Sequence, residues 1–162
     1  MIFREMRRKR QALPLEECEA ILRAGSCGVL ALSGDDGYPY AVPLSYVYAG
    51  GMLYFHSARS GHKLDAVRRN GKASFCVIAQ DQVVPEEYTT HFRSVIVFGR
   101  IRVLEAEEEK RAAIEQLAVK YAPDDTPEGR QAAIRQSWEL LCMLQLQPEH
   151  ISGKAAKELL PK

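Results

Sequence analysis

Short segments rich in β-branched and aromatic residues follow one another along much of the chain, with strong turn signals between them. Gly34-Asp35-Asp36-Gly37 and Ala49-Gly50-Gly51 are two such signals, and the second predicts a hairpin. The segments predicted to be strands are 27–33, 38–48, 52–57, 72–82, 93–105 and 140–147. This spacing predicts a mainly β (α+β) fold, a small antiparallel barrel of five or six strands with flanking helices.

Helices are expected before, within and after this run of strands. Pro14 suits a first turn and Gly25 a helix end, and Thr126-Pro127 has a cap residue and a proline in the favoured order. Ser60 can cap a helix that begins at Gly61. The predicted helices are 14–24, 61–69, one that contains the apolar stripe Ile114, Leu117, Ala118 and Tyr121, and one from 127 to about 138. His91 and His150 are expected in solvated loops.

Composition excludes several classes of protein. The 162 residues suit one domain, and 22 Lys and Arg against 21 Asp and Glu leave no basic field for nucleic acid. The longest apolar run, Val95 to Phe98, is far too short to span a membrane, and no signal peptide precedes the charged N-terminal residues. We therefore expect a cytoplasmic protein that binds neither nucleic acid nor membrane. The four cysteines lack metal-ligand spacing, so we expect reduced packing residues and no metal site.

The chain divides into a basic N-terminal arm at 1–11, one domain at 12–154 and a C-terminal tail at 155–162. The arm carries four consecutive cations from Arg7 to Arg10. Two interpretations remain open: a solvated tail, or an arm that folds over a partner subunit or an anionic ligand.

The segment from Phe55 to Asn70 carries the clearest chemical signal. It predicts a strand end, a turn and a helix start, where unpaired backbone N–H groups and the helix dipole favour an anion. Gly61 permits close approach to the backbone, and Lys63 places a cation in the first turn. With Ser57, Ser60 and His62 as donors, this corner predicts a phosphate site. The alternative is an ordinary capped surface helix with a solvated lysine.

Pro43 interrupts a predicted strand, where it removes a ladder hydrogen bond. It indicates either an edge strand protected from mispairing or a position that faces a ligand. In the same strand, alternation predicts that five side chains point to one face: Tyr40, Val42, Leu44, Tyr46 and Tyr48.

Three motifs in this order resemble a known family. DGYPYAVPLSY (36–46), LYFHSARSGHKLDAVRRN (53–70) and SVIVFGRI (94–101) resemble the pyridoxamine 5′-phosphate oxidase-related FMN-binding split-barrel proteins, and most of all the nitroimidazole-resistance (Nim-type) flavoproteins. The resemblance runs from about Arg4 to Lys154. It implies a six-stranded antiparallel split β-barrel, a homodimer, and FMN bound in clefts at the subunit interface.

The resemblance also implies roles for individual residues. The main chain of residues 40–44 would run beside the isoalloxazine ring, residues 56–58 beside the ribityl chain, and His62 and Lys63 at the phosphate. Ser94 would approach the cofactor from the other subunit, and Lys154 belongs to the family's common chain ending. The implied cofactor-binding residues are Tyr40, Val42, Pro43, Leu44, His56, Ser57, Ala58, His62, Lys63, Ser94 and Lys154.

The resemblance implies an FMN-dependent oxidoreductase of small molecules, with nitroaromatic compounds among the candidate substrates. No dinucleotide-binding motif is present, so NAD(P)H would dock only transiently over the flavin. His56 is the candidate catalytic residue, donating a proton or a hydrogen bond to substrate; alternatively, it only bonds backbone. The Arg-containing C-terminal substrate segment of the vitamin B6 oxidases is not found in this sequence, so vitamin B6 oxidation is not expected of it. A non-catalytic module that binds flavin, heme or deazaflavin is the alternative function.

Overall fold

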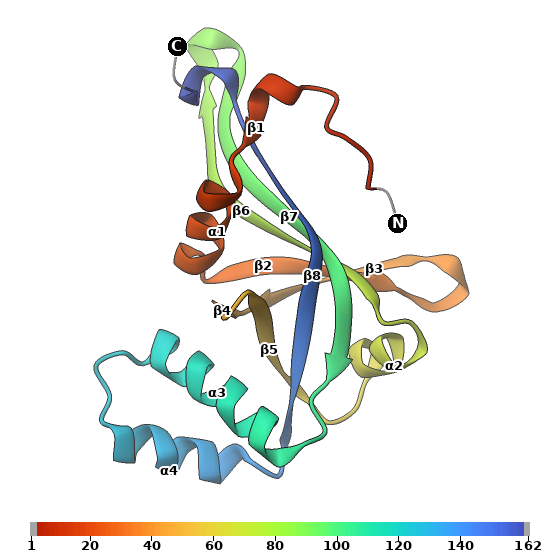
Figure 1. Ribbon diagram of the computed structural model, residues 1–162, viewed down its shortest axis with the longest axis vertical. Helices are drawn as coiled ribbons and strands as arrows, with labels where there is room; N and C mark the ends of the chain where they lie inside the picture. Colours follow the sequence, from red (N-terminus) through yellow and green to blue (C-terminus); the bar gives the residue numbers. More distant parts are fainter. Residues whose placement is uncertain (1–2, 161–162) are drawn as a thin grey trace.

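Eight strands form one antiparallel sheet in the computed structural model, which describes residues 3–160 (Figure 1). The order across the sheet is β3-β2-β6-β7-β8-β5-β4, with β1 paired to β8. Six strands have seven or more residues, which confirms the predicted six-stranded split barrel. The strands are β1 (Ala12–Leu13), β2 (Cys27–Ser33), β3 (Pro39–Ser45), β4 (Val47–Ala49), β5 (Met52–Ala58), β6 (Lys72–Val84), β7 (Thr89–Val103) and β8 (Leu141–Ala155).

Four α-helices flank the sheet: α1 (Leu15–Ala24), α2 (His62–Arg69), α3 (Glu107–Tyr121) and α4 (Pro127–Ser137). α3 and α4 form a hairpin at the end of the molecule away from the C-terminus (Figure 1). The predicted Thr126 cap is confirmed, since its hydroxyl accepts the Gly129 N–H at 3.0 Å. Within residues 3–160, no helix is both long and apolar enough to cross a membrane.

The predicted Ser60 cap is wrong. Gly61 occupies the N-cap position of α2 with a φ of 118°, and no side chain caps the helix. The chain enters the helix through a backbone conformation that suits glycine, so Ser60 lies one residue too early to reach the first turn.

The predicted strand 38–48 is interrupted at Tyr46. Its side chain is fully buried, and its hydroxyl donates to the Leu22 carbonyl at 2.8 Å. The Tyr121 hydroxyl accepts the Tyr46 N–H at 3.0 Å and lies 3.0 Å from the Tyr46 carbonyl. These contacts replace ladder bonds, and Val47 and Tyr48 beyond the break are both buried. The expected alternation therefore holds for Tyr40, Val42 and Leu44 but not beyond.

Two strands are longer than predicted. β7 begins at Thr89 and β8 continues to Ala155, so His91 and His150 lie in strands and their predicted loop positions are wrong. His91 pairs with Gln82 and His150 with Phe98. This pairing satisfies the backbone hydrogen-bonding groups of polar stretches whose own residues do not predict a strand.

The main core is built around aromatic rings. Phe75 meets Tyr46 and Phe55 edge-to-face, with ring centroids 4.9 and 5.0 Å apart. A second, smaller apolar cluster lies where α3 and α4 cover the sheet, and its buried residues are Leu104, Ala113, Ile114, Ile134 and Met143.

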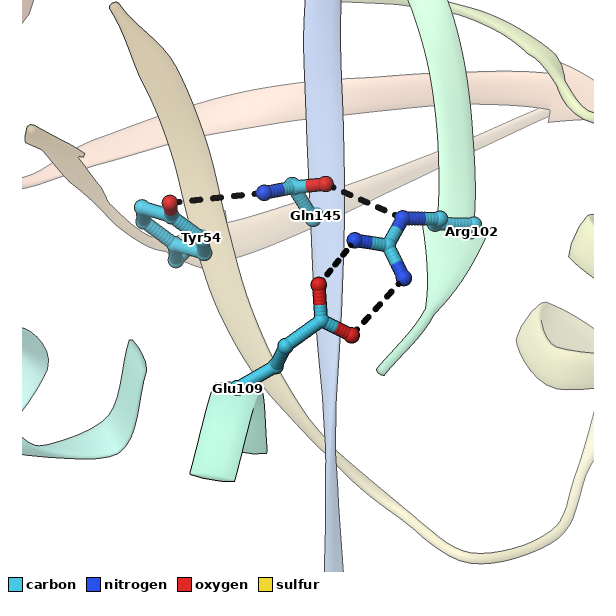
Figure 2. A network of polar contacts seen from close by, with 4 residues as sticks. All are labelled: Tyr54, Arg102, Glu109 and Gln145. Atoms are coloured by element: carbon cyan, nitrogen blue, oxygen red, sulfur yellow. Dashed lines mark hydrogen bonds and ion pairs between the residues drawn. The ribbon is translucent and has the colours of Figure 1, made fainter. Parts of the chain in front are cut away.

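Polar contacts attach the first turn of α3 to the sheet. The Arg102 guanidinium donates to both Glu109 carboxylate oxygens at 2.6 and 3.1 Å and to Gln145 Oε1 at 3.0 Å. The Gln145 amide then donates to the Tyr54 hydroxyl at 3.4 Å, so the network joins α3 to β7, β8 and β5 (Figure 2). At the other end of α3, Lys120 bonds the Gly25 carbonyl and Tyr121 contacts Tyr46. The helix is fixed at both ends.

Part of the N-terminal arm lies against the chain's own sheet. The Phe3 ring stacks on His150 with centroids 4.8 Å apart and lies 5.8 Å from Phe98. Gln11 is buried, whereas the basic side chains between these two residues are exposed. Met1 and Ile2 lie outside the described residues.

Candidate functional site

The end of β5 and the start of α2 form the corner predicted from residues 55–70. The Leu64 and Asp65 N–H groups donate to the Gly61 carbonyl at 2.9 and 3.2 Å. The N–H groups of His62 and Lys63 precede the first bond within the helix, so they remain available to a ligand. A Cβ added at Gly61 would meet no atom within 4 Å, so the space beside this backbone is open.

Lys63 is the distinctive cation of this corner. Its side chain is half-buried, and it makes no ion pair or hydrogen bond within residues 3–160. Burial lowers the pKa of its ammonium group, an effect only partly offset by the nearby Cys142 thiol. An ammonium group removed from water without a carboxylate is unfavourable alone and is compensated by a bound anion. The donors of this corner therefore fit a phosphate group.

His62 is held by protein groups on the side of the corner facing β3. Its ring stacks on Tyr40 with centroids 4.1 Å apart, and its Nε2 lies 3.5 Å from the Asp35 carboxylate. Asp35 also pairs with Arg69 at 2.8 Å. His62 thus connects β3 to α2, and a phosphate contact by its side chain would compete with Asp35.

β3 lies at one end of the strand order, and among residues 3–160 it pairs only with β2. Tyr40, Val42 and Leu44 pack against the main core, while Pro43 points to the outer face opposite Val29. The edge position expected for the strand that carries Pro43 is confirmed. Along the edge of β3 that faces away from β2, the main-chain N–H and C=O groups have no partner strand in the described part of the chain. The contact of residues 40–44 with a flavin ring stays a prediction.

The three predicted residues of β5 differ in their surroundings. Ser57 is buried opposite Cys142, whose thiol donates to the Ala58 carbonyl at 3.4 Å. His56 is exposed opposite Met143, and its side chain borders a cavity of about 370 Å³ between the sheet and the α3–α4 hairpin.

Ser94 and Lys154 lie far from this corner within one chain. They are a cross-strand pair on β7 and β8, and the Lys154 ammonium group lies 5.4 Å from the centre of the Phe92 ring. Lys154 comes twelve positions after Cys142 along β8, which corresponds to roughly 40 Å of extended strand from the corner. One chain does not bring Ser94 and Lys154 together with Lys63.

The sequence prediction did not include Asp35, Arg68 and Cys142 in this region. Asp35 orients His62, and Arg68 lies on α2 without an ion pair within residues 3–160. Burial raises the pKa of the Cys142 thiol, an effect that nearby Lys110, Lys63 and Arg68 reduce. Asp35 and Cys142 come from distant segments, so no local pattern points to them. In the described part of the chain, no three His, Cys, Asp or Glu side chains gather as a metal-binding set.

Together, the antiparallel sheet, its open edge strand and the basic strand–helix corner define a protein of the split-barrel class. The chain belongs to the pyridoxamine 5′-phosphate oxidase family, whose sequence model matches residues 14–155.

Two known proteins are similar to this chain, one in sequence and one in sequence and fold. An uncharacterized protein of Rhizobium meliloti (strain 1021) is 36% identical over 91 residues, and the match covers 56% of this chain and 55% of that relative. The chain thus matches about half the length of this curated relative. An FAD-binding protein from Mesorhizobium loti is 27% identical with a TM-score of 0.66, covering 91% of this chain and 98% of that one.

A candidate 5-nitroimidazole antibiotic resistance protein from Bacteroides thetaiotaomicron VPI-5482 shares the fold. Its TM-score is 0.74 at 21% identity, and the match covers 88% of this chain and 85% of that one.

Proposed function

We propose that this protein is an FMN-dependent oxidoreductase of small molecules that binds the FMN phosphate at the corner between β5 and α2. The observation that carries the proposal is Lys63, a half-buried ammonium group that has no acidic partner in the described part of the chain and lies beside two free helical N–H groups. A phosphate supplies the charge that this corner lacks. The family membership and the FAD-binding relative support a flavin as its source.

The proposal includes a homodimer with FMN at the interface. Cross-strand register places Pro43, Val29, Cys76 and Ile96 in one row on the outer face of the sheet. Ile78 lies on the same face and is 65% exposed, and Val29 and Ile96 are each 39% exposed, so apolar side chains gather on this face. A second copy would cover this face, which also carries Ser94 and Lys154, and would bring both residues to the Lys63 corner that they do not reach within one chain.

When bound, FMN supplies hydride and electron transfer. Lys63 and the helical N–H groups hold the phosphate, while the edge of β3 orients the ring. His56 borders the cavity beside this site and donates a hydrogen bond or a proton to the substrate from its imidazole. NAD(P)H would dock transiently as the electron donor, and nitroaromatic compounds are candidate acceptors.

The test compares FMN and riboflavin binding to the full chain by flavin fluorescence. Lys63→Ala should weaken FMN binding about 10- to 150-fold, because a charge-assisted hydrogen bond contributes about 1.5–3 kcal/mol. Riboflavin lacks the phosphate and should bind both proteins equally. Lys72→Ala is the control, since Lys72 is an exposed lysine on the neighbouring strand. Unchanged FMN affinity in Lys63→Ala would refute the phosphate site.

A second measurement concerns catalysis. The FMN-loaded protein should lose its visible flavin absorption when NADH or NADPH is added and regain it with a nitroaromatic acceptor. Reduction by dithionite but not by NADH or NADPH would contradict the proposed electron donor and would favour a non-catalytic flavin-binding module.

A further inference from the structure

The cavity beside His56 combines apolar walls with polar side chains that have no hydrogen-bond partner. Ile114 and Leu117 of α3 and Ile134 of α4 form its apolar walls, and its volume is about 370 Å³. His56 and Ser45 border it on the sheet side, and neither side chain makes a hydrogen bond in the described part of the chain. Apolar walls with a few convergent polar groups are typical of small-molecule sites.

Arg130 places a positive charge on the wall that α4 forms. Its side chain is half-buried, and one nitrogen, Nη1, donates to the Ala122 and Asp125 carbonyl oxygens. Among the described residues, its Nε and Nη2 have no acceptor and the guanidinium forms no ion pair. A guanidinium has five N–H donors in a planar fork, so donors remain for a ligand. As at Lys63, a half-buried cation without an acidic partner favours an anion.

The charges near Arg130 favour an anion with a single negative charge. Asp125 also borders the cavity, where its exposed carboxylate accepts the Thr126 N–H at 2.8 Å and forms no ion pair with Arg130. A phosphate monoester would add two negative charges beside Asp125 for one guanidinium. A carboxylate adds one, and its two oxygens match the planar donors of arginine.

The cavity is formed before any ligand arrives, because both helices that enclose it are fixed. The Arg102–Glu109 network holds the start of α3 against the sheet (Figure 2). The Lys110 ammonium group donates to the Trp138 carbonyl at 2.7 Å, which holds the end of α4 against α3. A preformed site loses little conformational freedom on binding, which favours affinity for a small ligand.

We propose that this cavity is the substrate site and that it binds small aromatic monocarboxylates, with the carboxylate on Arg130 and the ring between the apolar walls. The inference rests on the proposed function, whose nitroaromatic acceptors contain a ring of this kind. On the sheet side, His56 and Ser45 would hydrogen-bond a polar substituent of the ring. Arg130 thus determines the charge of the substrate, and the space between the helices determines its size.

The test uses two compounds that share one ring and differ in charge. para-Nitrobenzoate carries a carboxylate, and para-nitrobenzamide is neutral. Binding of each to the full, flavin-free chain is measured by isothermal titration calorimetry at pH 7. The acid should bind at least tenfold more tightly than the amide. Equal or weaker binding of the acid would overturn the proposed selectivity.

Replacing Arg130 tests whether its charge is the cause. Arg130→Gln should weaken binding of the acid at least tenfold and leave binding of the amide unchanged, because the apolar walls remain. Arg135→Gln is the matched control, since Arg135 is an exposed arginine on α4 that does not line the cavity. A preference for the acid that persists in Arg130→Gln, or equal losses for acid and amide, would overturn the role of Arg130.

Variants that fill the cavity locate the ring within the molecule. Ala118 and Ala133 both line the cavity, so Ala118→Leu and Ala133→Leu should each weaken binding of acid and amide alike, at least tenfold. Ala132→Leu is the matched control, because Ala132 is an exposed neighbour on α4 that does not line the cavity. Unchanged binding of both compounds in both filled variants, with circular dichroism showing intact folds, would overturn the site.

FMN titration of the same proteins separates the two proposals. Arg130→Gln and the filled variants should retain the wild-type FMN affinity, because none of these positions belongs to the phosphate corner. A wild-type chain that prefers the acid as expected but binds no FMN would refute the flavin function while leaving the carboxylate site. A chain that binds FMN but shows no preference for the acid would refute the carboxylate site alone.

Discussion

At the residue scale, the state of Lys63 links the phosphate corner to pH. Burial lowers the pKa of its ammonium group below the ordinary value of 10.5, and a bound phosphate would raise it again. FMN affinity should therefore be highest below the lowered pKa and should fall as the pH rises through it. The ratio of FMN to riboflavin affinity, measured from pH 7 to 10, isolates this effect because both flavins share the same ring. Lys63→Arg should show a flat ratio, and a decline that persists in this variant would assign the titration to another group.

Tyr46 sets a second prediction at this scale. Its hydroxyl satisfies the Leu22 carbonyl in the last turn of α1, which has no partner within the helix. Tyr46→Phe leaves that carbonyl buried and unpaired, and should lower the free energy of unfolding by about 1–3 kcal/mol. Urea denaturation measures the change. Tyr88→Phe, at a position 98% exposed, should leave the stability unchanged; an equal loss in both variants would contradict this role.

At the element scale, the ion pair between Arg102 and Glu109 fixes the start of α3 to the sheet. Hydrogen bonds from Arg102 lower the pKa of the Glu109 carboxyl below its ordinary value of 4.5. A group with a lowered folded-state pKa stabilises the fold above its unfolded pKa, and this contribution is lost as the pH falls through the folded value. Glu109→Gln should therefore be less stable than wild type at pH 7, and the difference should shrink below pH 4.5.

Urea denaturation at pH 7 and pH 3 measures this difference. Glu108→Gln is the matched control, because Glu108 lies in the same helical turn and makes no ion pair within residues 3–160. Both substitutions remove a negative charge near the helix N-terminus, and only Glu109→Gln also removes the pair. If both variants show the same change in the free energy of unfolding at each pH, Glu109 stabilises the protein only through its charge near the helix N-terminus and not through the ion pair.

The elements show which parts of the fold local sequence can predict. The six long strands and the four helices were predictable because apolar periodicity and turn residues mark them locally. The outer halves of β7 and β8 were not, since stretches such as Thr89–His91 become strand only by pairing with a partner far along the chain. Tyr46 likewise leaves its strand because of contacts with α1 and α3, which no local pattern contains.

The same distinction applies to the candidate site. Lys63 and Gly61 were predictable because one segment of sixteen residues holds both of them. Asp35 and Cys142 reach it only through sheet and helix packing. The cavity beside His56 needs two helices that follow the strand by some fifty residues and more, so its volume and its lining could emerge only from the structure.

At the scale of the whole molecule, the outer face of the sheet and the phosphate corner are parts of one site only if two copies assemble. Ile78 pairs with Ser94, and Ser94 pairs with Lys154, so an apolar side chain lies in one row with two predicted cofactor contacts. In that case, formation of the dimer both buries this face and completes the site. Assembly and FMN affinity should be lost together when a charge is placed in the row.

Ile78→Glu tests this coupling. A carboxylate buried in an apolar interface without a cation opposes association, so the variant should be monomeric in light scattering and should bind FMN at least tenfold more weakly than wild type. Val119→Glu is the control, because Val119 is 50% exposed on α3, away from the sheet face, and this variant should keep both properties. A monomeric Ile78→Glu with wild-type FMN affinity would show that one chain suffices for binding, and a dimeric Ile78→Glu would place the interface on another surface.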